Sequence, residues 1–291
     1  MGLHDAYWTR LALSCMRWMP MWLITALTYP ITLLIYILAV PQREALRHNL
    51  SALVPGGDSS MAGYRVLQQF ALTYVDRLWH LHFGKEVTWE VLPQGRFDEL
   101  RAEPGGVLVF TVHSGNYDIG ASLFASKFGR VIHTVRMPEM TAGLQQLREK
   151  ELRDQESKEP HLRIHYNSPG SHLGIELCRV LAAGEAVCVQ GDRVIGDVAP
   201  MYVEVEGLRY EIPRGPLVLA EVTAVPCYPV FLKRLGRLSY AVEIGEPFHP
   251  GGGRPKCAQL APKWAAVMHD FLQRHWDQWF VFEPLVSKVP S

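Results

Sequence analysis

The stretch that decides the fold is VLVFTVHSGNYDIG, residues 107–120. Its first part, Val107 to Val112, is an unbroken run of mostly apolar and β-branched residues, which is typical of a strand buried on both faces. His113 follows, a turn is predicted at Ser114-Gly115, and a helix is predicted from Tyr117 to Phe128. This order places His113 at the carboxyl end of a buried strand, where α/β proteins carry their reactive groups.

Short apolar runs alternate with longer helical patterns through the rest of the chain. This alternation predicts an α/β fold with a central, mostly parallel sheet flanked by helices. Further strands are expected at 131–136, 162–166, 186–190, 201–205, 227–232 and 238–244. Helices are expected at about 140–157, 172–183 and 258–282, and amphipathic helices at 42–100, interrupted at 55–58.

A hydrophobic segment precedes this domain. No charged residue occurs from Met21 to Val40, and Pro20 and Pro41 bracket the run. Twenty helical residues span about 30 Å, close to the hydrocarbon thickness of a bilayer. The segment is compatible with a membrane-embedded or interfacial anchor, with a buried pair of core helices, or with a cleaved signal peptide. Residues 1–45 are therefore predicted to associate with a membrane, and residues 46–291 to form the α/β domain.

Charge and cysteine content exclude several classes of function. The 291-residue chain has 29 basic and 29 acidic residues, so no overall basic field favours nucleic acid. Its five cysteines are scattered and include no C-x-x-C pair, which argues against a disulfide framework or a zinc ribbon. No His-Glu-x-x-His or calcium-loop pattern is present, and no metal site is predicted.

His113 and Asp118 form the candidate catalytic pair. Asp118 lies five residues after His113, in the first turn of the predicted helix, where the helix dipole favours a carboxylate. A tight turn would bring this carboxylate to one imidazole nitrogen and leave the other as a general base. A histidine at a strand end is also often only structural, and the spacing alone does not decide between the two.

Several motifs together resemble the lipid A late acyltransferases, the lauroyl and myristoyl transferases, a family that also includes mycobacterial phosphatidylinositol mannoside acyltransferases. The central similarity is His-x4-Asp, His113 to Asp118. Four further stretches match in order and spacing: REALRHNL at 43–50, Gly-Asp-Arg at 191–193, IPRGP at 212–216 and WDQWF at 276–280. The resemblance extends over nearly the whole chain.

The resemblance implies an O-acyltransferase of the cytoplasmic (inner) membrane of a bacterium, with its active site facing the cytoplasm. The acyl donor would be a thioester of acyl carrier protein or coenzyme A, and the acceptor a hydroxyl of a lipid or glycolipid. Transfer would be direct, with His113 as the base and Asp118 holding it, and without a bound cofactor. The residues expected to contact substrate are Asn116, Arg136, Asp192, Arg193 and Arg214; the arginines suit phosphate recognition, and Asp192 is expected to order its turn or an arginine.

Two other classes of function remain open from the sequence. The same histidine and aspartate would serve a hydrolase of lipid esters or phosphates. Alternatively, the fold would bind lipid without catalysis. The acceptor, the donor and the length of the acyl chain are not determined by these residues.

Overall fold

The computed structural model describes residues 6–54, 59–138, 142–168, 170–194, 198–251 and 257–289. Its centre is a seven-stranded sheet with the order β1-β9-β8-β2-β5-β3-β4. The strands are β1 (Thr88–Leu92), β2 (Val107–Thr111), β3 (Ile132–Arg136), β4 (Leu162–Tyr166), β5 (Ala186–Gln190), β8 (Cys227–Gly236) and β9 (Ser239–Ile244).

Five neighbouring strands run in one direction. The pairs β8–β2, β2–β5, β5–β3 and β3–β4 are all parallel. Only the edge differs, because β9 returns antiparallel to β8 and β1 lies parallel to β9. The predicted mostly parallel sheet flanked by helices is therefore confirmed, although β1 falls within a stretch that was expected to be helical.

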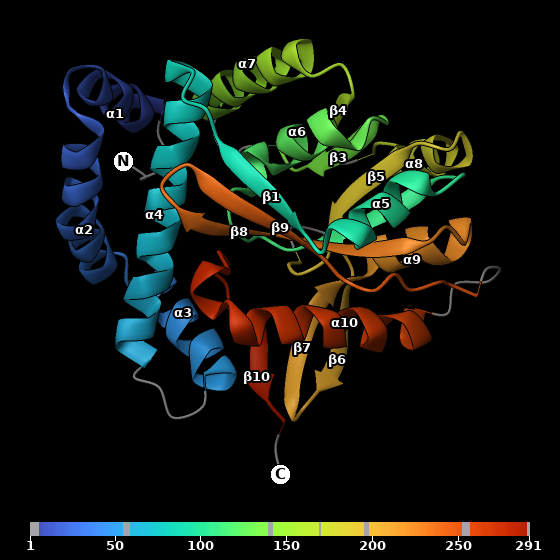
Figure 1. The fold of residues 1–291 in the computed structure, drawn as a ribbon. Helices are drawn as coiled ribbons and strands as arrows, with labels where there is room; N and C mark the ends of the chain where they lie inside the picture. The colour runs from blue at the N-terminus through green and yellow to red at the C-terminus, as the bar shows by residue number, and fades with distance from the viewer. Residues whose placement is uncertain are drawn as a thin grey trace.

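The alternation of side chains along β2 shows how the sheet is covered. Val107 and Val109 pack on the face covered by α5 (Gln94–Ala102) and α6 (Tyr117–Phe128). Leu108 and Phe110 pack on the opposite face, beneath α8 (Leu173–Ala182), α9 (Arg214–Thr223) and α10 (Cys257–Arg274). Figure 1 shows α6 above the sheet, with α7 (Ala142–Lys158) beyond it, and α10 below the sheet. Each large apolar side chain buried in this way contributes about 1.5–3 kcal/mol.

A second, antiparallel sheet lies beside α10. It has the order β10-β7-β6 and consists of β6 (Pro200–Val205), β7 (Leu208–Pro213) and β10 (Val286–Lys288). The sequence predicted β6 but not β7 or β10. The predicted final helix ends at Arg274 instead of residue 282. A short 3-10 turn follows at Trp276–Gln278, where the Gln278 side chain accepts a hydrogen bond from Arg234 N and donates one to Arg234 O.

Four helices precede the sheet: α1 (Ala6–Trp18), α2 (Met21–Leu38), α3 (Val40–Leu53) and α4 (Ser59–Phe83). α2 and α3 both pack along α4, at the left of Figure 1. The boundary predicted after residue 45 falls inside α3, whose Leu46 and Leu50 share a core with Phe280 near the C-terminus. The N-terminal helices and the α/β domain therefore share packed side chains.

The exposed side of α2 is apolar, unlike the exposed side of a helix in a typical soluble protein. Its buried positions are Ile24, Thr28, Thr32 and Tyr36. Its exposed positions are almost all apolar and include Leu27, Ile31, Leu34 and Leu38. Among the described residues, α2 is the one helix long and apolar enough to cross a membrane, and only 22% of it is buried.

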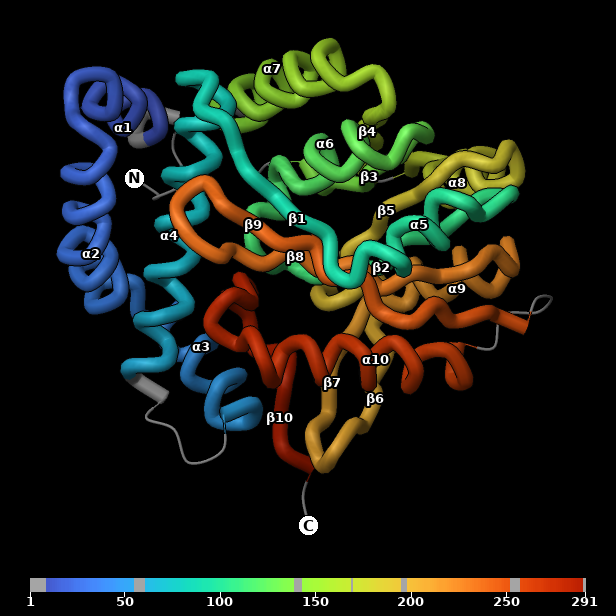
Figure 2. The backbone as a smooth tube through the Cα atoms, in the orientation of Figure 1, coloured from blue at the N-terminus to red at the C-terminus, as the bar shows by residue number. Residues whose placement is uncertain are grey.

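Asn49 joins α3 to the C-terminal segment, and Figure 2 shows the two lying side by side. Its side chain is 1% exposed; Nδ2 donates to Glu283 O, and Oδ1 accepts from Leu285 N and Val286 N. One buried amide thus pairs three backbone groups of a segment more than 230 positions away.

We expect Asn49→Ala to lower the free energy of unfolding by about 2–4 kcal/mol, because it leaves buried backbone groups unpaired. Urea denaturation monitored by circular dichroism measures this. Gln42→Ala, at an exposed position of the same helix, is the control and should change stability by less than about 0.5 kcal/mol. Equal stability of the two variants would contradict the bridging role.

Candidate active site

His113 is held by a single carboxylate, that of Asp192. The Asp192 carboxylate accepts a hydrogen bond from His113 Nδ1 at 2.8 Å and another from the His113 backbone N–H at 2.9 Å. Because a carboxylate only accepts, Nδ1 carries the proton and Nε2 is left as an acceptor. Among the described residues Nε2 has no hydrogen-bond partner, and this atom is not fully enclosed by protein. The ring therefore presents a fixed, available base.

The register of β2 against β5 explains why these residues meet. The final residues of the two strands, Thr111 and Gln190, are direct partners across the parallel pair. His113 and Asp192 each lie two residues beyond these partners, so both leave the sheet at the same edge. Gly191 N donates to Thr111 O at 2.9 Å and keeps the two chains together past the last pair.

The C-terminal segment completes the support of the histidine. Trp279 Nε1 donates to Asp192 Oδ2 at 2.9 Å, and Phe280 N donates to His113 O at 2.8 Å. Gly115 allows the turn after His113, since its φ is +52° and a Cβ there would lie 2.4 Å from Leu232 O. Trp279 was not identified from the sequence as a site residue, although the match at 276–280 pointed to this segment.

Asp118 does not hold His113, which corrects the predicted pairing. It lies in the first turn of α6 and is held by three arginines from three elements: Arg77 of α4 at 3.4 Å, Arg148 of α7 at 2.7 Å, and Arg136 of β3. Burial by itself would raise the pKa of Asp118, but Arg148, Arg136 and Arg77 lower it well below its usual range. Asp118 therefore stays ionised and gathers these guanidinium groups; we call Arg77, Arg136 and Arg148 the arginine cluster.

A second carboxylate extends this network. Glu151 on α7 pairs with Arg77 at 2.5 Å, with Arg148 at 3.1 Å and with His82 at 2.9 Å. Burial opposes the charge of Glu151, but the His82 hydrogen bond and the two arginines lower its pKa to about 2. Among the described side chains, Asp118 and Glu151 together thus hold all three arginines of the cluster.

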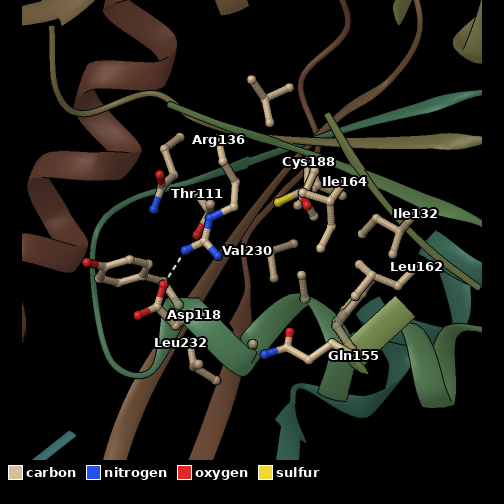
Figure 3. A pocket seen from close by; sticks show the side chains of 18 of the residues that line it. Thr111, Asp118, Ile132, Arg136, Gln155, Leu162, Ile164, Cys188, Val230 and Leu232 are labelled. Carbon is tan, nitrogen blue, oxygen red and sulfur yellow. Dashed lines mark hydrogen bonds and ion pairs between the residues drawn. The ribbon is translucent and has the colours of Figure 1, made fainter. Parts of the chain in front are cut away.

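An apolar cavity lies next to this network, between α6, α7 and the sheet. Figure 3 shows its charged end, where Arg136 and Asp118 meet, and its interior, where Ile132, Leu162 and Ile164 gather. Its volume is about 100 Å³, below the about 300–1,000 Å³ of sites for drug-sized ligands.

Tyr117 connects the cavity to the histidine. It lines the cavity, and its ring meets the His113 ring edge to face, with 5.2 Å between centroids. Burial and the adjacent Asp118 raise the pKa of Tyr117 to about 12, so its hydroxyl stays protonated. Tyr117 therefore contacts both the cavity and the His113 ring, which does not itself line the cavity.

Of the five predicted substrate-contacting residues, only Arg136 lines the cavity. Asp192 holds the base instead of contacting substrate. Asn116 is 1% exposed and donates to Thr73 O and to the Tyr240 hydroxyl, so it supports the turn from inside. Arg193 forms an ion pair with Glu283 at 3.6 Å. Arg214 is exposed at the start of α9 and does not line the cavity.

Comparisons with known proteins leave the family open. No model of a known protein family matches the chain, and no curated protein matches it. In the part of the chain that the structure describes, no group of three or more histidine, cysteine, aspartate or glutamate side chains is arranged to hold a metal ion.

The depressed pKa of Glu151 predicts a pH-dependent contribution to stability. The contribution is fully present above the ordinary pKa of 4.5 and is lost as pH falls toward about 2. We expect Glu151→Gln to cost about 3 kcal/mol at pH 7, with the difference from the wild type shrinking steadily through this window. Urea denaturation at a series of pH values measures it.

Glu149→Gln, on the same helix but paired with the exposed Arg153, is the control and should cost less than about 1 kcal/mol at any pH. A Glu151→Gln deficit that stays constant from neutral to acid pH would contradict the charge-based explanation.

Proposed function

We propose that the protein is a membrane-associated O-acyltransferase, in which His113 is the general base for transfer of an acyl chain from a thioester to a hydroxyl of a lipid or glycolipid. The observation that carries this proposal is a histidine held by Asp192 with Nε2 left unpaired among the described residues, whose ring packs on Tyr117 in the wall of an apolar cavity with one charged end. The sequence resemblance described above points to the same chemistry.

The proposed reaction takes place in one direct transfer. Nε2 removes the proton of the acceptor hydroxyl as its oxygen attacks the thioester carbonyl. The tetrahedral intermediate collapses by breaking the carbon–sulfur bond, and the leaving thiolate takes the proton back from the imidazolium. Asp192 stabilises the imidazolium in between and keeps the ring in its tautomer.

The cavity is proposed to hold the acyl chain. Its wall is formed mainly by apolar side chains from six strands and two helices, which bury hydrocarbon favourably. The charged residues that line it, Asp118 and Arg136, lie together at one end. The thioester of a chain inserted from that end remains near His113.

The arginine cluster is proposed to bind phosphate. Acyl carrier protein and coenzyme A both carry phosphate on the pantetheine arm, and lipid acceptors often do. Guanidinium groups bind phosphate through paired hydrogen bonds. Asp118 would then act by holding Arg136 and Arg148 in place, and its contribution to the reaction would be indirect.

The exposed apolar side of α2 is proposed to be the membrane contact. α2 packs on α4 through Thr28, Thr32 and Tyr36, so the folded domain lies along its length. If α2 crossed the membrane, charged residues of the adjacent α4 such as Asp76 would lie within the bilayer, at a high cost in free energy. A helix lying in the interface, with Trp18 and Trp22 exposed beside it, avoids this cost.

We expect His113→Ala to lower the rate of acyl transfer from an acyl-coenzyme A or acyl carrier protein thioester by about 10²- to 10⁴-fold, because the hydroxyl loses its base. Asp192→Asn should also lower the rate at least 10²-fold by releasing the ring tautomer. Mass spectrometry of acylated lipid products, with protein of verified melting temperature, measures both.

His161→Ala changes a half-exposed histidine outside the site and should leave the rate unchanged. A folded His113→Ala protein with wild-type turnover would remove His113 as the base. Loss of thioester without acylated lipid would instead indicate a hydrolase, and retention of lipid without turnover a binding protein.

We expect the triple variant Ile31→Gln, Leu34→Gln, Leu38→Gln to release the protein from lipid vesicles, because it removes apolar area from the exposed side of α2. Flotation with phospholipid vesicles measures the bound fraction.

The matched control, Ile175→Gln, Val222→Gln, Leu235→Gln, alters side chains that are exposed to a similar extent on other elements. Only the α2 variant should shift to the unbound fraction. Equal flotation of both variants would place the membrane contact elsewhere.

A further inference from the structure

One polar atom in the lining of the proposed acyl cavity is fully buried and has no hydrogen-bond partner. Gln155 lies on α7, is 6% exposed and lines the cavity. Its Nε2 is buried and makes no hydrogen bond. In Figure 3 the side chain extends from α7 into the cavity, on the side opposite the strand residues Ile164 and Val230.

Gln155 is well separated from the charged end of the cavity. On the same helix Arg148 reaches Asp118 at the mouth, and Gln155 lies seven residues further, about 10 Å along the axis. On β3 the lining changes in the same direction, from Arg136 at the mouth to Ile132 inside. The amide therefore meets a ligand part-way along its length.

Burying an amide without a partner costs free energy, and a leucine in its place would avoid that cost. No charged side chain lines the cavity at this depth, where Gln155 is accompanied by residues such as Phe124, Ile132 and Leu162. The environment therefore suits a neutral polar group on an otherwise apolar ligand.

We infer that the cavity selects an acyl chain with a hydroxyl group part-way along its length, and that Gln155 binds this hydroxyl. A hydroxyl both donates and accepts, so it pairs with the amide in either orientation of the amide. A plain hydrocarbon chain would leave the amide desolvated and unpaired. This inference rests on the proposed function, because it takes the cavity to be the acyl site.

The test compares dodecanoyl-coenzyme A with isomers whose single hydroxyl is placed at successive carbons of the chain. Binding is measured by calorimetry with the full-length protein in detergent, and transfer by competition between pairs of thioesters. We expect one isomer to be preferred over the plain chain by about 10-fold, with the preference falling at neighbouring carbons.

Gln155→Leu should abolish or reverse this preference while improving the use of the plain chain, and its melting temperature should equal or exceed that of the wild type. Gln146→Leu, the same change at an exposed position of the same helix outside the cavity, is the control and should keep the wild-type preference. Equal binding of plain and hydroxylated chains by the wild type, or an unchanged preference in Gln155→Leu, would overturn the inference. In either case transfer of the plain chain would leave the proposed function standing, whereas absence of binding and transfer for every chain would end both.

Discussion

The site depends on one buried carboxylate that receives three hydrogen bonds. Asp192 accepts from the backbone and the ring of His113 and from the indole of Trp279. Burial by itself would raise the pKa of Asp192, but His113 and these hydrogen bonds lower it, so the group stays ionised. A buried charge is tolerated only when its hydrogen-bonding capacity is met. This requirement joins three segments that are far apart in sequence, the ends of β2 and β5 and the C-terminal turn.

The two acids near the site have separate tasks because their surroundings differ. Asp192 faces an imidazole and an indole and orients a base. Among the described residues, Asp118 pairs with the guanidinium groups of the arginine cluster, and Glu151 on α7 also pairs with two of them. The charged residues that line the cavity therefore lie at one end, and the other end is apolar. An amphipathic ligand would bind in one orientation, with its polar group at the charged end.

Helix α4 connects the charged end of the cavity to the N-terminal helices, which carry the exposed apolar side of the molecule. α4 supplies Arg77 to the cluster, and it supplies Tyr74, whose hydroxyl is 3.0 Å from Thr9 Oγ1 of α1. Asp76 of α4 accepts hydrogen bonds from Arg234 and Tyr240 on β8 and β9. The N-terminal helices are therefore anchored to the sheet by buried polar contacts as well as by apolar packing. A substrate arriving from a lipid surface at α2 would approach the mouth of the cavity along this helix.

Local patterns along the chain determined most strands of the central sheet and the helices between them, but not β1, β7 or β10. The apolar runs around β2, β3 and β5, and the turn after His113, are encoded by neighbouring residues, and they place the histidine at a strand end. The choice of acid was not local. Asp118 is near His113 in the chain, but the start of α6 turns it toward the arginines. Asp192 is 79 positions away and becomes a neighbour only because β5 pairs with β2 although β3 and β4 lie between them in sequence. Strand order, the return of Trp279 and the empty hydrogen-bond position of Gln155 follow from long-range packing. The periodicity of a strand reports burial and carries no information about which strand lies beside it. Only the tertiary structure therefore decided these three features.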